Sequence, residues 1–154
     1  PEIEKHAREG NPKSFAFPRA HLKGAPFNFS FSGLKTAVLY QLEKLDDPQA
    51  HLADLCASFQ DAVIDTLVKK TLKAARQTGH TLITLSGGVA CNRTLQEALT
   101  LAAQNAGIKV QPTPPALTTD NAGMIALAAL LASENRPSDS LEIGIDPNLV
   151  LATP

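Results

Sequence analysis

The chain has 154 residues, of which 44% are hydrophobic and 19% charged, which excludes a disordered chain and is enough for one domain with its own core. Its net charge of −1 gives no general attraction to nucleic acid, and no apolar run approaches the roughly 20 residues that a bilayer-spanning helix needs. Only two cysteines occur, in unrelated settings, which argues against a disulfide framework and predicts a cytoplasmic location.

Residues 1–26 are polar and interrupted by glycine and proline, so we expect a loop-rich linker with a short helix around residues 2–9. The mild basic bias of this segment favours a solvated loop. Residues 27–31 alternate apolar and polar side chains and predict a half-buried strand. Ser32 and Gly33 then turn into a helix that continues to about residue 42.

A long amphipathic helix follows. Asp47 is a suitable N-cap, Pro48 fits its first turn, and Gly79 fits the position just beyond its end. Apolar side chains recur at helical spacing and mark its buried face, namely Leu52, Leu55, Cys56, Phe59, Val63, Leu67 and Leu72.

The second half of the chain alternates strand and helix patterns. Residues 81–85 predict a buried strand, residues 92–106 a helix closed by Gly107, and residues 108–110 a short strand. After several prolines, a helix is expected at residues 120–134 and an extended edge segment at 141–151. This alternation predicts an α/β fold, with a mixed sheet flanked by helices.

The turn formed by Ser86, Gly87 and Gly88 lies between a predicted strand and a predicted helix. Glycine permits a sharp turn and a close approach by a ligand, and backbone N–H groups at a helix N-terminus suit an anion. A tight turn requires glycine without any ligand, so both interpretations remain open. Asn92 either caps the following helix or hydrogen-bonds a ribose or a base.

Asp120 presents the same choice between a helix cap and a metal ligand. The histidines show no pair at metal-binding spacing, so a metal held by this chain alone is not expected. Lys35 follows an incomplete phosphate-loop pattern and is either a phosphate contact or a surface lysine. Cys56 is expected to pack in the core, and Cys91 lacks the neighbouring base that a catalytic thiol needs.

Three segments together resemble a known family: residues 29–36 (FSFSGLKT), 86–93 (SGGVACNR) and 119–126 (TDNAGMIA). In order and spacing they are similar to the C-terminal half of the tRNA N6-adenosine threonylcarbamoyltransferases (TsaD), formerly called the O-sialoglycoprotein endopeptidase or glycoprotease family. The resemblance extends from about Pro1 to Leu151. It implies that residues 1–154 form one lobe of an actin-like ATPase (ASKHA) fold, in which two lobes close over a nucleotide.

The resemblance also implies an activity. Family members transfer a threonylcarbamoyl group from threonylcarbamoyl-adenylate to the N6 amine of the tRNA adenosine next to the anticodon. By position, Gly87, Gly88 and Asn92 resemble nucleotide-binding residues, and Asp120 resembles a ligand of one divalent metal, iron or zinc. No side chain is assigned a catalytic role. The implied partners are tRNA and the companion proteins TsaB and TsaE, without a membrane.

The other metal ligands of the family, a pair of histidines, lie in an N-terminal lobe that this sequence lacks. No secretory leader is visible. Because the chain begins at Pro1 and its only methionine is Met124, we expect a truncated piece, which should be inactive alone because half of the metal ligands are missing. Two alternatives remain: a lobe of an ATPase or phosphotransferase with the same fold, and a non-catalytic interaction module.

Overall fold

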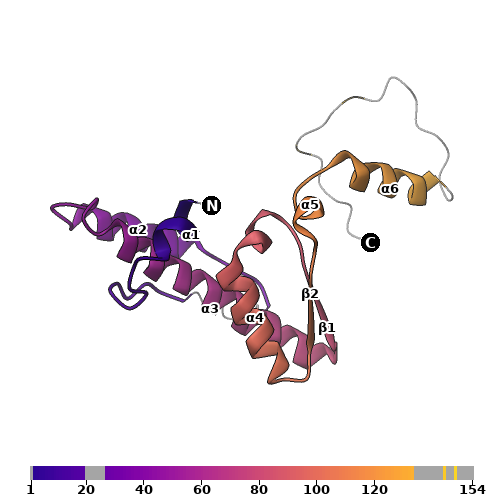
Figure 1. Cartoon of the computed structure of the whole chain (residues 1–154), viewed down its shortest axis with the longest axis horizontal. Helices are drawn as coiled ribbons and strands as arrows, with labels where there is room; N and C mark the ends of the chain where they lie inside the picture. The colour runs from indigo at the N-terminus through magenta and orange to yellow at the C-terminus, as the bar shows by residue number, and fades with distance from the viewer. Residues whose placement is uncertain (1, 20–26, 134–143, 145–147, 149–154) are drawn as a thin grey trace. The chain divides into compact units, whose positions relative to one another are not determined.

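The computed structural model describes residues 2–19, 27–133, 144 and 148. Figure 1 shows its helices and strands in chain order. The chain divides into two compact units, Pro1–Thr119 and Asp120–Pro154. The first unit contains all the described elements except the helix α6, which belongs to the second.

Three helices form the first part of the first unit: α1 (Glu2–Ala7), α2 (Ser32–Glu43) and α3 (Leu52–Thr78). The predicted end of α3 is confirmed, because Gly79 adopts a left-handed φ of 72° that a residue with a side chain would resist. Its predicted start is wrong. Asp47 accepts hydrogen bonds from the N–H groups of Gln49 and Ala50 and so caps a preceding turn, after which α3 begins at Leu52.

A βαβ arrangement forms the other part of the first unit. The strand β1 (Leu82–Leu85) is followed by the 3-10 helix η1 (Gly88–Cys91), α4 (Arg93–Gln104) and the strand β2 (Lys109–Pro112). The strands pair in parallel, and the helical crossover is the connection that parallel neighbours require. The predicted α/β class is confirmed, although the described sheet consists of these two parallel strands and not of a mixed set.

Two hydrophobic clusters lie along α3. The first joins the C-terminal half of α3 to the sheet and α4, through Leu72, Ala75, Ile83, Leu99, Ala103 and Ile108. The second joins the N-terminal half of α3 to α2 and the segment before it, through Phe17, Leu34, Leu55 and Ala62. Figure 1 shows the same division, with α2 beside one half of α3 and the strands beside the other.

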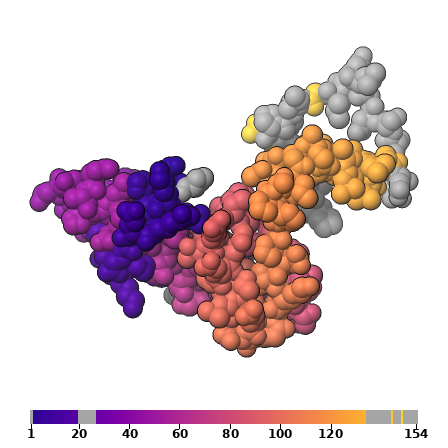
Figure 2. All heavy atoms as spheres, viewed as in Figure 1, coloured from indigo at the N-terminus to yellow at the C-terminus, as the bar shows by residue number. Residues whose placement is uncertain are grey.

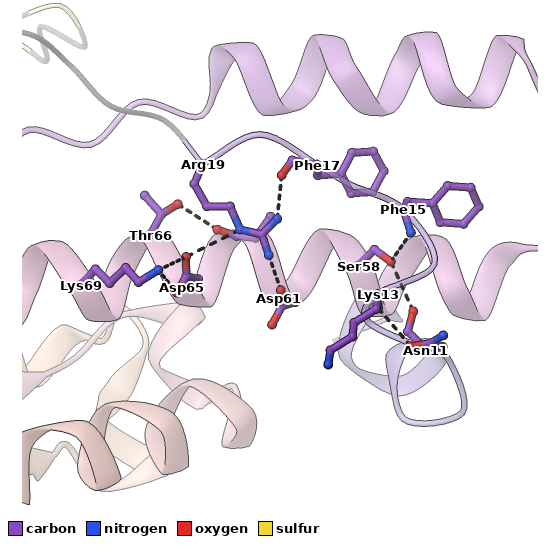
Figure 3. A network of polar contacts seen from close by, with 11 residues as sticks. Asn11, Lys13, Phe15, Phe17, Arg19, Ser58, Asp61, Asp65, Thr66 and Lys69 are labelled. Carbon is purple, nitrogen blue, oxygen red and sulfur yellow. Dashed lines mark hydrogen bonds and ion pairs between the residues drawn. The ribbon is translucent and has the colours of Figure 1, made fainter.

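The polarity of the segment after α1 predicts a solvated loop, but part of this segment packs on α3. Phe17 is only 5% exposed, and the side chain of Ser58 in α3 accepts a hydrogen bond from the N–H of Phe15 at 3.1 Å. Arg19 forms ion pairs with Asp61 and Asp65 of α3 (Figure 3). In the space-filling view the indigo N-terminal residues accordingly lie directly against the magenta helices (Figure 2).

Residues 27–31 do not form the strand that their alternation predicted. The Lys70 ammonium of α3 donates to the carbonyl oxygen of Asn28, so a side chain satisfies this backbone group instead of a neighbouring strand. A short helix, α5 (Pro115–Thr118), was not predicted, and α6 spans Ala122–Ser133. The extended segment expected at 141–151 lies outside the described residues, apart from positions 144 and 148. No helix in the described ranges has the length and apolarity needed to cross a membrane.

Candidate functional site

The glycine turn lies at the carboxyl end of β1. Gly87 has φ 91° and ψ 166°, a backbone conformation that residues other than glycine rarely adopt. Its N–H donates to the carbonyl oxygen of Thr118 at 2.9 Å. A Cβ added at Gly87 or Gly88 would meet no atom within 4 Å. The backbone conformation therefore requires glycine at position 87, and the space that a side chain would occupy is open at both glycines.

The sequence pattern predicts that the turn leads directly into α4, but a short helix lies between them. Gly88 begins the four-residue helix η1, whose Ala90 N–H donates to the carbonyl oxygen of Gly87 at 2.9 Å. The glycines and the N-terminus of α4 are thus separate features.

Asn92 caps α4. Its side-chain Oδ1 accepts a hydrogen bond from the N–H of Leu95 at 2.9 Å, in the geometry of an N-cap residue. Its Nδ2 donates to Oε1 of Gln60 in α3 at 2.8 Å. The capping interpretation of Asn92 is confirmed. Since an amide has a second N–H and a second lone pair, its binding to a ligand stays a prediction.

A second side chain occupies the N-terminus of α4. Oε1 of Glu4, in α1, accepts a hydrogen bond from the N–H of Arg93 at 3.0 Å. A carboxylate is favoured there because the helix dipole places partial positive charge at its N-terminus. Two of the donors that the sequence suggested for an anion, the N–H groups of Arg93 and Leu95, are therefore engaged within the protein.

Asp120 lies in the second unit, immediately before α6. The cap of α6 is Asn121, whose Oδ1 accepts a hydrogen bond from the N–H of Met124 at 3.0 Å. The interpretation of Asp120 as the helix cap is therefore wrong by one residue, because the helix begins at Ala122. Asp120 is exposed, and its role as a metal ligand stays a prediction.

The described residues do not by themselves form a metal site. Among the described residues, no three His, Cys, Asp or Glu side chains come close enough together to hold an ion. Of the four histidines, His21 lies outside the described residues. A single carboxylate such as Asp120 is too few ligands for a stable iron or zinc site, which takes three or four protein side chains.

Lys35 is exposed at a hollow of about 350 Å³ that is otherwise lined by Phe31, Val38, Leu39 and Phe59. Nothing in this apolar lining completes a phosphate site, and the phosphate role of Lys35 stays a prediction. Burial raises the pKa of the half-buried Cys56 thiol, which disfavours the reactive thiolate.

Sequence reasoning missed two residues that organise this region, Gln60 and Glu4. Gln60 looks like any polar residue of an amphipathic helix, and Glu4 lies 89 residues before Arg93. No local pattern could have linked either side chain to α4, because both contacts depend on how distant helices pack.

Comparison with known proteins gives a consistent result. The family model described as TsaD, tRNA N6-adenosine threonylcarbamoyltransferase, matches residues 1–127. A protein of that name from Symbiobacterium thermophilum is 45% identical over 98% of this chain and 44% of its own length. Those from Thermosipho africanus and Syntrophotalea carbinolica are 42% and 48% identical, over 97% and 82% of this chain and 45% and 37% of their own lengths.

The chain thus spans less than half the length of these curated relatives. The family model nevertheless covers the three motif segments and ends in the middle of α6. By this match, the chain belongs to the tRNA N6-adenosine threonylcarbamoyltransferase family.

Proposed function

We propose that this chain is the C-terminal lobe of an enzyme that transfers a threonylcarbamoyl group from threonylcarbamoyl-adenylate to the N6 amine of the tRNA adenosine next to the anticodon. The observation that carries this proposal is the family match over residues 1–127, which includes all three motif segments. This match favours the transferase over an ATPase lobe or an interaction module. Family membership also agrees with an actin-like variety of the observed α/β fold.

The reaction is an acyl transfer. The adenosine N6 attacks the carbamoyl carbon, a new C–N bond forms, and the bond from that carbon to the phosphate oxygen breaks. N6 gives up one proton to solvent, and AMP leaves with the electron pair of the broken bond. A protein accelerates such a step by holding N6 against the carbamoyl carbon in a reactive orientation and by stabilising the charge that develops on the leaving phosphate.

In this proposal, Gly87, Gly88 and Asn92 bind the adenylate. The open space beside both glycines supports this role, because a ligand can approach the backbone where no Cβ intervenes. Asn92 is half-buried and held at both ends of its amide, which leaves a rigid N–H available for a ribose or phosphate oxygen. Preorganised donors of this kind require little reorganisation when they bind.

The family resemblance further supports Asp120 as one ligand of a divalent metal, iron or zinc, whose other ligands would come from outside this chain. It also supports tRNA as the acceptor, TsaB and TsaE as companion proteins, and a cytoplasmic location. Each of these remains a proposal for the whole enzyme.

The test joins this chain to the remainder of the Symbiobacterium thermophilum relative, so that the fusion protein has full length. Transfer is measured with synthetic threonylcarbamoyl-adenylate and unmodified tRNA, beside the relative itself as a positive control. We expect the fusion protein to modify tRNA and the 154-residue chain alone to be inactive. A folded fusion protein without activity would contradict the proposed function, and activity of the chain alone would contradict its assignment as a half-site.

A further inference from the structure

Gln60 forms the second of the two hydrogen bonds that hold the Asn92 amide, the first being the helix cap at Leu95. It lies in the N-terminal half of α3, 32 residues before Asn92, and its Oε1 accepts from Asn92 Nδ2 at 2.8 Å. Its own Nε2 makes a long contact of 3.5 Å with the Thr94 hydroxyl in the first turn of α4. Both Gln60 and Asn92 are half-buried.

An asparagine amide can exchange its oxygen and nitrogen by a half-turn, so its direction depends on its partners. The N–H of Leu95 requires an acceptor and takes Oδ1 of Asn92. The Oε1 of Gln60 requires a donor and takes Nδ2. A reversed amide would place its nitrogen against the Leu95 N–H, so this backbone donor selects the orientation, and Gln60 then holds the amide nitrogen in place.

In this orientation Asn92 still has one Nδ2 hydrogen that neither partner uses, because the amide nitrogen carries two. Its direction is set by the same two hydrogen bonds. Without Gln60, the cap alone would hold the oxygen, and the nitrogen would be free to swing with the side-chain torsion angles. A donor that must first be ordered binds a ligand less well than one that is already fixed.

We propose that Gln60 is a positioning residue, which fixes the Asn92 amide so that its remaining N–H meets an oxygen of the nucleotide. This role rests on the proposed function, in which Asn92 contacts the adenylate. The helix α3 carries none of the three motif segments. In this proposal it nevertheless contributes to the affinity of the site for the nucleotide.

The first experiment uses the 154-residue chain and needs no ligand. Nuclear magnetic resonance of the Asn92 side-chain NH₂ group reports the hydrogen bond through the shift difference between its two protons. Gln60→Met keeps the length of the side chain but removes the acceptor, so we expect this difference to change to that of a free asparagine amide. Gln60→Glu keeps an acceptor and should preserve it. Unchanged resonances in Gln60→Met would overturn the positioning role.

The second experiment uses the full-length fusion protein with AMP as the probe. We expect Gln60→Met to weaken AMP binding about tenfold while the midpoint of chemical unfolding stays close to that of the unsubstituted protein. Gln77→Met is the matched control, since Gln77 is an exposed residue of the same helix. It should bind AMP normally.

The decisive comparison repeats Gln60→Met in an Asn92→Ala background. If Gln60 acts through Asn92, its substitution should have no further effect on AMP affinity there. An equal loss in both backgrounds would mean that Gln60 acts on the fold and would overturn the proposal. If the unsubstituted fusion protein fails to bind AMP, the proposed function fails, while the resonance experiment still decides whether Gln60 positions Asn92.

Discussion

Glu4 and Arg93 are joined across 89 residues of sequence by a hydrogen bond of 3.0 Å from the Arg93 N–H to the Glu4 carboxylate. The contact ties α1, the first helix of the chain, to the first residue of α4. Together with the Asn92 cap it satisfies backbone donors that the end of a helix otherwise leaves without an intrahelical partner. The N-terminal residues therefore help to hold the helix next to the glycine turn.

We predict that Glu4→Ala lowers the free energy of unfolding by about 0.3–1 kcal/mol, the usual contribution of a carboxylate at a helix N-terminus. Glu2→Ala is the control, because Glu2 lies in the same first turn of α1 and is exposed. Urea unfolding at low ionic strength measures both. Equal effects would show that the contact with α4 adds nothing beyond the stability of α1.

The two glycines of the turn should respond differently to alanine. Gly87→Ala forces a side chain into φ 91° and should cost about 1–3 kcal/mol of stability. Gly88 has no positive φ and open space at the Cβ position, so Gly88→Ala should leave stability nearly unchanged. Thermal unfolding compares the two variants of the 154-residue chain.

Gly88→Ala also tests whether the turn faces the nucleotide. In the full-length fusion protein, Gly88→Ala should weaken AMP binding at least fivefold although the protein folds normally, because its methyl group occupies the approach to the backbone. Normal AMP affinity in this variant would exclude Gly88 from the nucleotide site.

Asp120 and Asn121 separate the capping role from the ligand role. Asn121→Ala should remove the bond to the Met124 N–H, cost about 1 kcal/mol of local helix stability and speed hydrogen exchange at that amide. Asp120→Asn should leave that exchange unchanged, yet lower the metal content and activity of the fusion protein. Retention of both would mean that Asp120 is not a ligand.

Asp54 should make the stability of the folded protein depend on pH in the acid range. The N–H of Asn11 and then the hydroxyl of Ser14 donate to its carboxylate and hold the pKa of Asp54 below its ordinary value near 3.8. A lowered pKa in the folded state stabilises the protein above the ordinary value, and this contribution is lost as the pH falls through the folded-state pKa. Stability should therefore decline below about pH 4, and Asp54→Asn should reduce that decline in urea titrations at pH 2–6.

Much of the local structure was predictable from the sequence, because its signals act between near neighbours. Gly79 and Gly107 mark helix ends at positive φ, and the strand patterns near residues 83 and 110 are those of β1 and β2. The alternation at 27–31 predicted a strand that does not form, because a strand needs a neighbouring strand as the partner of its backbone. Here the side chain of Lys70 hydrogen-bonds the backbone carbonyl of Asn28 instead. At Asp120, two adjacent residues could each cap a helix, and local pattern alone could not choose between them.

The sequence by itself determined the order of the longer helices and of the strands β1 and β2, the glycine turn and the family, since each depends on residue types at fixed spacing. Only the tertiary structure decided which distant side chains meet. The docking of residues 11–19 on α3, the contact of Glu4 with α4, and the hold of Gln60 on Asn92 all depend on how α3 packs. Packing brings together residues tens of positions apart, and a hydrogen bond between two ordinary polar side chains leaves no periodic trace in the sequence.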